Sequence, residues 1–183
     1  MSFAKLPIET PRLLLRALEP EDADAIYAIF SDPLVAKYWS SPAWTTMDQA
    51  RDFVRRAMDD CQNGSSLRLG LVRREDGRLI GQCTFFSISH QNRRAEIGYS
   101  MASDAWGQGF MDEALRALID YGFCELNFIR IEADIDPRNA ASARSLERLG
   151  FGFEGLMRHR WIVAGEVSDT GFYGLLREQW LKP

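Results

Sequence analysis

The sequence predicts an α/β (α+β) fold, with a mixed, mostly antiparallel central sheet of about seven strands that is flanked by about four helices. Three observations support this fold class. Helical segments are interleaved through a sequence that otherwise reads as strands. One strand–helix–strand unit, which ends at Ile135, has the form of a right-handed parallel crossover. The 183 residues are 46% hydrophobic and contain no linker or internal repeat, so we expect one domain over residues 1–183.

The N-terminal third predicts one strand and two helices. The run RLLLRAL, Arg12–Leu18, predicts the first strand, and the helix after it, Glu19–Asp32, has acidic residues in its first turn, where the helix dipole favours them. Pro33 should end this helix. A Thr-x-x-Asp sequence that resembles a capping box then begins an amphipathic helix, whose apolar residues recur at helical spacing from Ala50 until Gly64 stops it.

The middle of the chain predicts three antiparallel strands and a helix. The runs Leu67–Arg74 and Arg78–Phe86 flank the turn sequence Glu-Asp-Gly, which is a hairpin signal, and Arg93–Met101 is the third run. After a glycine-containing stretch, Phe110–Glu125 places its apolar residues on one side. This segment should be a helix that faces the core.

The C-terminal third predicts a strand, a short helix and a pair of strands. In Ile129–Ile135 the apolar residues alternate with charged ones, as in a strand with one buried face. The sequence DPRNAASARSLERLG predicts a turn and a short helix that ends at Gly150. The last two strands are expected at Phe153–Val163 and Val167–Leu176.

Composition and charge argue against several classes of function. The net charge of −4 and the pI near 5.3 disfavour a protein that binds nucleic acid directly, because such affinity depends on Lys and Arg. None of the three cysteines has a second Cys or a His at metal-ligand spacing, so we expect neither a disulfide framework nor a metal site. The sequence shows no signal peptide and no run of 18 apolar residues, so we expect no membrane association and a reduced, cytoplasmic location.

The stretch SDAWGQGFMDEAL lies between a predicted strand and a predicted helix, where backbone N–H groups are unpaired and can attract an anion. The groups in question belong to Gly107, Gln108, Gly109, Phe110 and Met111. The stretch matches neither the P-loop nor the dinucleotide-binding pattern. From these residues alone, a phosphate site and a plain turn are about equally good interpretations.

Two longer segments resemble a known family. The segments AEIGYSMASDAWGQGFMDEALRALIDYGF and NFIRIEADIDPRNAASARSLERLGFGFEG resemble the coenzyme A-binding half of the GNAT acetyltransferase superfamily, in its ribosomal-protein N-acetyltransferase (RimJ/RimL-like) branch. The N-terminal sequence ETPRLLLRALEPEDADAIY is similar to the start of that branch. The likeness spans nearly the whole chain and implies a GNAT-like (acyl-CoA N-acyltransferase) fold, with acetyl-CoA as cosubstrate and no metal.

The resemblance implies that the glycine stretch binds the pyrophosphate of the cosubstrate. Trp106 stands at the first position of the family's loop, where Gln or Arg is usual, and Met111 stands at the sixth, where Gly or Ala is usual. The backbone should therefore supply most of the binding. Because Asp112 and Glu113 oppose a phosphate, nearby positive charge should compensate for them. The candidates for this charge, which could equally be solvated helix residues, are Arg116, Arg144 and Arg148.

The resemblance also implies sites for the pantetheine arm and the thioester. The strand EIGYSM, which ends at Met101, would offer backbone groups to the arm and would splay from the strand RIEADI to admit it. Asn139 would bind a pantetheine amide, and Ser142 would donate a hydrogen bond to the leaving sulfur. The structural alternative is that Asn139 caps the helix and Ser142 lies in its first turn.

The group that accepts the amine proton is less well defined. We assign Glu96, on the strand before the loop, and leave open Asp169, His159 and a water relay. Relatives of the RimL type use a carboxylate on the strand after L-G-F, but the nearest position here is Trp161. A set of residues between the first two helices either walls the acceptor site or packs under a loop; it comprises Tyr38, Trp39, Trp44 and Met47.

The resemblance therefore predicts an acetyl-CoA-dependent N-acetyltransferase that acts on a primary amine. A protein N-terminal α-amine, with a pKa of about 7.7–8.0, is substantially neutral near pH 8 and would suit direct attack. One alternative is a small-molecule acetyltransferase for a polyamine, an amino acid or an antibiotic. Another is a non-catalytic acyl-CoA-binding module. A homodimer also stays open.

Overall fold

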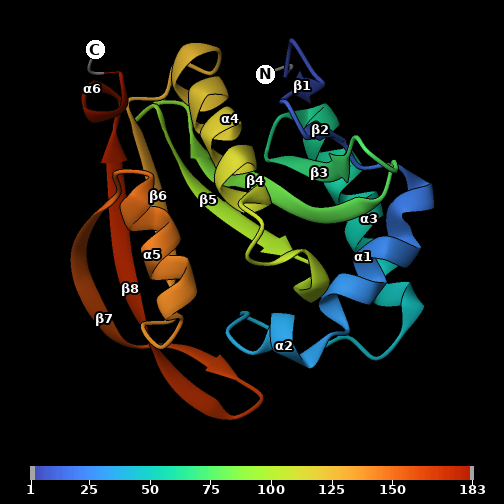
Figure 1. The fold of residues 1–183 in the computed structure, drawn as a ribbon. Helices are drawn as coiled ribbons and strands as arrows, with labels where there is room; N and C mark the ends of the chain where they lie inside the picture. The colour runs from blue at the N-terminus through green and yellow to red at the C-terminus, as the bar shows by residue number, and fades with distance from the viewer. Residues whose placement is uncertain (1–2, 182–183) are drawn as a thin grey trace.

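An eight-stranded sheet runs through residues 3–181, which the computed structural model describes (Figure 1). The strand order is β1-β2-β3-β4-β5-β6-β8-β7, and neighbouring strands are antiparallel except for β5 and β6, which are parallel. The strands are β1 (Ile8–Glu9), β2 (Leu13–Ala17), β3 (Leu67–Arg73), β4 (Leu79–Ser89), β5 (Arg94–Met101), β6 (Arg130–Ile135), β7 (Gly152–Val163) and β8 (Glu166–Leu176). The mixed, mostly antiparallel sheet is confirmed, with the two-residue β1 as an addition.

Helices cover both faces of this sheet. Figure 1 shows α4 and α5 on one face, and α1 and α3 on the other side, near β3 and β4. The α-helices are α1 (Ala23–Phe30), α2 (Pro33–Ala36), α3 (Met47–Asn63), α4 (Phe110–Cys124), α5 (Ala140–Arg148) and α6 (Arg177–Trp180). The four longest correspond to the four predicted helices, whereas α2 and α6 have only four residues each. Among the described helices, none has the length and apolar character needed to cross a membrane.

Two groups of buried side chains hold the helices to the sheet. The larger group lies beneath α4 and α5, and the smaller one joins α1 and α3 to the sheet. Gly122 lets α4 approach the sheet closely, because a Cβ at this position would lie 2.7 Å from the ring of Phe85. Representative members of the larger group are Leu115, Leu118, Ile119, Ile131 and Leu146, and of the smaller group Ile26, Phe30 and Val54.

The local structure differs from the sequence prediction around the first two helices. The segment predicted as one helix over residues 19–32 starts as a short 3-10 turn, and α1 ends at Phe30. Pro33 begins α2, because its fixed φ is helical and its missing N–H is not needed in a first turn. The capping box of α3 is formed by Thr46 and Gln49, one residue beyond the Thr-x-x-Asp pair that the sequence suggested.

The two parallel strands, β5 and β6, are paired over only a short distance. The paired residues are Arg94 with Arg130, Ala95 with Ile131 and Glu96 with Glu132. Beyond these three rungs, β5 continues to Met101 and β6 to Ile135 without pairing to each other. The sheet therefore splits along this line, and the split opens toward the loop that precedes α4. The parallel crossover and the splay expected from the sequence are both present.

Candidate functional site

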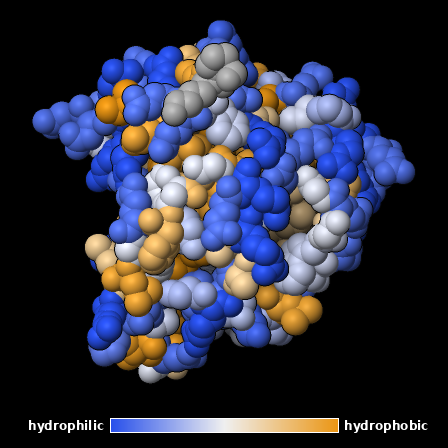
Figure 2. Space-filling model, turned by 60° about the vertical axis from the view of Figure 1, so that its left-hand side comes forward, coloured by the Kyte–Doolittle hydropathy of each residue, from blue (hydrophilic) through white to orange (hydrophobic). Residues whose placement is uncertain are grey.

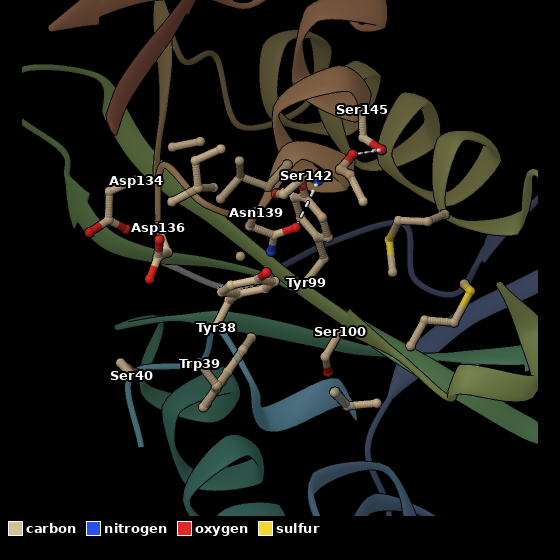
Figure 3. A pocket seen from close by; sticks show the side chains of 18 of the residues that line it. Tyr38, Trp39, Ser40, Tyr99, Ser100, Asp134, Asp136, Asn139, Ser142 and Ser145 are labelled. Atoms are coloured by element: carbon tan, nitrogen blue, oxygen red, sulfur yellow. Dashed lines mark hydrogen bonds between the residues drawn. The ribbon is translucent and has the colours of Figure 1, made fainter. Parts of the chain in front are cut away.

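A cavity of about 1830 Å³ opens where β5 and β6 separate. Its lining runs from Arg12 and the N-terminus of α4, past the split strands, to α2 and the β7–β8 hairpin. Figure 3 shows Tyr38 and Trp39 on one side of the cavity and Asn139 and Ser142 on another. Figure 2 shows hydrophobic residues recessed between hydrophilic ones at the surface. Because a site for one small molecule usually has about 300–1,000 Å³, the cavity has room for two reactants.

The glycine-containing loop presents a row of free backbone N–H groups. Within residues 3–181, no amide from Gly107 to Asp112 has a hydrogen-bond partner, and the first helical bond joins the Glu113 N–H to the Gly109 carbonyl at 3.1 Å. Both glycines are left-handed, with φ of 74° at Gly107 and 77° at Gly109. Other residues adopt this conformation only at a cost. This backbone geometry suits an anion at the N-terminus of α4.

Arg12 lies beside this loop, although it is not among the arginines that the sequence suggested. Its Nη1 donates to the Gln108 carbonyl at 2.8 Å, its Nε donates to Glu113 at 2.6 Å, and its guanidinium lies 4.5 Å from the centre of the Phe110 ring. Thr10 Oγ1 also donates to Glu113, at 2.6 Å. Burial alone would raise the pKa of Glu113, but these hydrogen bonds bring it below its ordinary value. Glu113 is therefore ionised, and Arg12 neutralises its negative charge at the loop.

The other acidic residue in the first turn of α4 is also paired. Asp112 accepts a hydrogen bond from Arg116 Nε at 2.8 Å, and its second oxygen lies 3.8 Å from Arg148 Nε. Both arginines line the cavity, whereas Arg144 is not among the lining residues. With Arg12, three guanidinium groups face the two carboxylates of this turn. One positive charge is therefore in excess beside the free amides.

Trp106 orders the loop. Its Nε1 donates to the Met101 carbonyl at 2.9 Å and so ties the loop to the end of β5. The Met101 oxygen accepts this bond and has a second lone pair that a further donor could reach. Gln108 Nε2 adds a second tie, to the Asp104 carbonyl at 3.2 Å. Met111 is partly buried against the core and still lines the cavity, which is how the loop accommodates a large residue there.

Ser142, in the first turn of α5, is hydrogen-bonded to Tyr99 of β5, and the two oxygens are 2.7 Å apart. Asn139 is the N-cap of α5, because its Oδ1 accepts the Ser142 N–H at 3.1 Å. The structural role that the sequence left open for Asn139 is thus present, and its Nδ2 stays available to a further acceptor. Burial raises the pKa of Tyr99 to about 12, so its hydroxyl keeps its proton at neutral pH.

Glu96 stands at the last rung of the β5–β6 pairing and lines the cavity. Desolvation raises its pKa, and the hydroxyl of Ser87 opposes this shift. The neighbouring carboxylates of Asp134 and Glu132 raise the pKa further, because they disfavour a third negative charge. A raised pKa suits a group that takes up a proton near neutral pH.

The two other candidate bases are arranged differently. Asp169 lines the cavity, but it accepts the backbone N–H of His159 at 2.8 Å, across an irregular part of the β7–β8 pairing. His159 is not among the lining residues. Trp161 lines the cavity and lies against Asp134. Desolvation raises the pKa of Asp134, while the Trp161 indole and the Arg160 guanidinium oppose the shift.

The aromatic residues between α1 and α3 divide into two kinds. Tyr38 and Trp39 line the cavity, and the Trp39 ring also meets Phe30 edge-on, with centroids 5.1 Å apart. Trp44 instead stacks on Phe30 at 4.6 Å, and it packs with Met47 against the smaller buried group. Tyr38 and Trp39 therefore form part of the cavity wall, whereas Trp44 and Met47 pack in the core beneath the loop.

Comparison with protein families decides which enzyme class this arrangement belongs to. A family model described as an acetyltransferase (GNAT) domain matches residues 12–152. The chain belongs to the GNAT acetyltransferase family. The matched range of the GNAT domain includes Arg12, the glycine loop, the split strands, Asn139 and Ser142. The chain is therefore an acetyl-CoA-dependent N-acetyltransferase, as the resemblance implied.

Individual GNAT relatives cover most of the chain. An uncharacterized N-acetyltransferase of Bacillus licheniformis is 42% identical over 161 residues, which are 88% of this chain and 90% of the relative. Spermidine N(1)-acetyltransferase of Escherichia coli (strain K12) is 26% identical over 85% of this chain and 81% of its own length. The crystal structure of a GNAT-family acetyltransferase from Bacillus anthracis superposes with a TM-score of 0.84 at 28% identity, over 94% of this chain and 99% of that one.

Three residues of the GNAT cavity were not found from the sequence. Arg12 is separated from Glu113 by 101 positions, and only the folded sheet edge brings the two together. Tyr99 meets Ser142 across the split, which no local pattern encodes. Asp134 did leave a signal, because the alternation of its strand places it on the charged face.

Proposed function

We propose that the α4 end of the cavity holds acetyl-CoA, with its pyrophosphate on the amides of Gly107–Asp112. The single observation that carries this proposal is the row of free amides, set beside an excess positive charge and at the open end of the split sheet. The pantetheine arm would run along the unpaired edge of β5, where Asn139 Nδ2 can donate to it. In support, one similar structure is described as a ribosomal L7/L12 alpha-N-protein acetyltransferase in complex with coenzyme A, with a TM-score of 0.84 at 22% identity.

The reaction we propose is direct transfer of the acetyl group in a ternary complex. A neutral amine nitrogen forms a bond to the thioester carbonyl carbon, and the carbon–sulfur bond then breaks to release a thiolate. If Tyr99 donates its hydrogen to Ser142 Oγ, the Ser142 hydrogen is free to be donated to that sulfur. Glu96 takes the proton that the acceptor ammonium loses. Holding both reactants in one cavity supplies the orientation that the step requires.

For the acceptor we propose the α-amine of a protein N-terminus. The part of the cavity beyond the split is bordered by α2 and by the β7–β8 hairpin, two separate elements that leave space for an extended chain between them. Tyr38, Trp39 and Trp161 offer aromatic surfaces there, and Glu96 and Asp134 offer negative charge. We also propose that residues 1–183 act as one domain, since one sheet extends from β1 to β7.

One observation favours a second acceptor, a polyamine. The acceptor end of the cavity contains several carboxylates, which would attract a small multiply charged amine. The carboxylates there that have no salt bridge within residues 3–181 are Glu96, Asp134 and Asp169. One relative is a spermidine N(1)-acetyltransferase.

Two measurements test the proposal. Calorimetry should detect binding of acetyl-CoA to the purified protein, and no binding at millimolar acetyl-CoA would contradict the donor assignment. Release of free coenzyme A thiol should then be measured with a peptide that has a free N-terminal serine, with spermidine and with lysine. Mass spectrometry of the product identifies the acetylated atom. Faster turnover of spermidine than of the peptide would make a polyamine, and not a protein N-terminus, the preferred acceptor.

A further inference from the structure

Two carboxylates at the split between β5 and β6 have no ion-pair partner in the described part of the chain. One is Glu96, at the last rung, and the other is Asp134, two residues beyond that rung on β6. Both line the cavity. By contrast, Glu132, the rung partner of Glu96, is held by Arg94 at 2.5 Å and by Arg130 at 2.8 Å.

Glu96 and Asp134 share one face of the sheet. Glu96 and Glu132 are direct Cα partners, and side chains two residues apart on a strand point to the same face, so Asp134 lies on the face of Glu96. The residues that alternate with them, Ile131 and Ala133, are buried beneath α4 and α5. The two carboxylates therefore face away from these helices, and the negative charge of Asp134 contributes to the raised pKa of Glu96.

The surroundings do not neutralise this pair. Ser87 acts on Glu96 and Trp161 acts on Asp134, but both of these groups are uncharged. Arg94 and Arg160 are the cations that influence the pair, and Arg94 is already bonded to Glu132. The other charged groups that line the cavity around the pair are Lys37, Arg68, Asp136, Arg138, Glu166 and Asp169. Arg68 shares the sheet face of Glu96 and has no salt bridge within residues 3–181, but it is not among the groups that shift the pKa of Glu96 or Asp134. Two partly desolvated carboxylates without an ion-pair partner cost free energy, which a bound cation would offset.

We propose that Glu96 and Asp134 act as one carboxylate pair that binds the acceptor as an ammonium ion and takes one of its protons. This inference rests on the proposed function, which assigned the role to Glu96 alone. An ammonium group has three N–H donors, so it can donate to both carboxylates at once. Asp134 is thus a further catalytic residue, because it touches the reacting nitrogen.

The protons balance in this scheme. The ammonium gives one proton to the pair and becomes a neutral amine, whose nitrogen attacks the thioester carbonyl. The nitrogen loses a second proton when the amide forms. The Ser142 and Tyr99 hydroxyls deliver one proton to the leaving thiolate and regain one from this second proton, through solvent in the cavity. The proton on the pair is then released to solvent, so the net products are the amide, coenzyme A thiol and one proton.

The test compares Asp134→Asn, Glu96→Gln and the double variant, with the serine peptide and spermidine as acceptors. Each single change should lower kcat/KM at pH 7 by about 100-fold, as for removal of a general base. Because the amide variants need an amine that is already neutral, their activity should recover as the pH approaches the pKa of the acceptor itself. The double variant should be less than about tenfold worse than either single variant, because residues that act as a unit are not additive.

Two further variants separate this role from general effects. Glu166→Gln removes one negative charge from the rim of the same cavity, where Glu166 is exposed and paired with Arg138 at 2.5 Å, and it should leave the pH profile unchanged. Asp134→Glu keeps the carboxylate and should retain the wild-type shape of the profile. Asp134→Asn should also bind acetyl-CoA with wild-type affinity.

The outcomes are distinguishable. If the wild type acetylates an amine but Asp134→Asn keeps the wild-type pH profile, the inference about Asp134 is wrong and the proposed function stands. Multiplicative effects in the double variant would equally overturn the joint role. If the wild type binds acetyl-CoA but releases no thiol with either acceptor, the proposed function itself fails. If Asp134→Asn melts well below the wild type at pH 7, the carboxylate is structural.

Discussion

The hydroxyl of Tyr99 and Oγ of Ser142 lie 2.7 Å apart and join β5 to the first turn of α5 across the split in the sheet. Neither residue is exposed, and Ser142 keeps only 9% of its surface accessible. Because Tyr99 retains its proton at neutral pH, the pair can supply a hydrogen bond to an atom in the cavity. In the proposed reaction, the two hydroxyls in series would donate this hydrogen bond to the leaving sulfur.

Replacing Ser142→Ala should lower kcat by about 100-fold, within the range for a lost proton donor, while the affinity for acetyl-CoA changes little. Tyr99→Phe should have a smaller effect on kcat, because Ser142 keeps its own hydrogen. Ser145→Ala is the matched control, since Ser145 lies on the same helix and lines the cavity, and its Oγ bonds to the Ala141 carbonyl at 3.0 Å and to Arg148 at 3.3 Å, away from Tyr99. Thiol release and calorimetry measure the two quantities. Equal losses of affinity and kcat would refute a transition-state role.

Gly107→Ala should weaken acetyl-CoA binding at least tenfold, because a left-handed φ of 74° disfavours any residue with a Cβ and the loop must shift. Gly77→Ala is a close control: its φ is 71°, and open space surrounds both positions. Both changes should cost about 1–2 kcal/mol of stability. Only the change at Gly107 should alter the calorimetric affinity, and an equal loss in both variants would show that the loop has no special role.

Arg12→Ala should raise the KM for acetyl-CoA several-fold, because one cation at the loop is lost. For the same reason, the KM of the variant should depend less on salt concentration than the KM of the wild type. The Gln108 carbonyl and Glu113 also lose a donor. Arg74→Ala provides the control, since Arg74 is similarly exposed, 49% against 47%, and pairs with Glu9 at the same sheet edge. The stability of both variants should fall by less than about 1 kcal/mol. An unchanged KM in Arg12→Ala would exclude Arg12 from donor binding.

Asp134 should reduce the stability of the wild type at neutral pH. Desolvation raises its pKa above the ordinary value, so the folded state binds the proton more tightly than the unfolded state does. Protonated Asp134 therefore adds to the free energy of unfolding. This contribution is fully present below the pKa of Asp134 in the unfolded state and is lost as the pH rises through its pKa in the folded state. Asp134→Asn should therefore gain stability relative to the wild type between about pH 4 and pH 7. Urea unfolding at both pH values measures this, and a constant difference would contradict it.

Most of the fold was predictable because its elements are encoded locally. Strand-like runs, some of them clearly alternating, predicted seven strands, and the glycine stops at Gly64 and Gly150 both adopt positive φ in the structure. The first helix ends before Pro33, as expected, but the sequence did not reveal that the same proline begins the short helix α2. The strand β1 has two residues and exists only through its pairing with β2, so no periodicity could reveal it.

The candidate site was predictable only in part. The glycine loop, Asn139 and Ser142 came from spacing and from resemblance, and the structure places them around one cavity, except for Gln108, which is not among the lining residues. Arg12 was not predicted, because its partners lie about a hundred residues away along the chain. The predicted cations were the arginines of α4 and α5. The sequence also could not show that Glu96 and Asp134 lack an ion pair within the described residues. Arg94 and Arg130 both pair with Glu132 instead, and this choice depends on tertiary geometry.

The short pairing of β5 with β6 has a mechanical consequence. Strands β1–β5 and strands β6–β8 form two panels of one sheet, joined edge to edge by three rungs. An extended ligand arm lying along the open edge of β5 would substitute for the strand that is missing there. The donor would then act as a removable structural element, and filling the seam would stiffen the two panels against each other before an acceptor arrives.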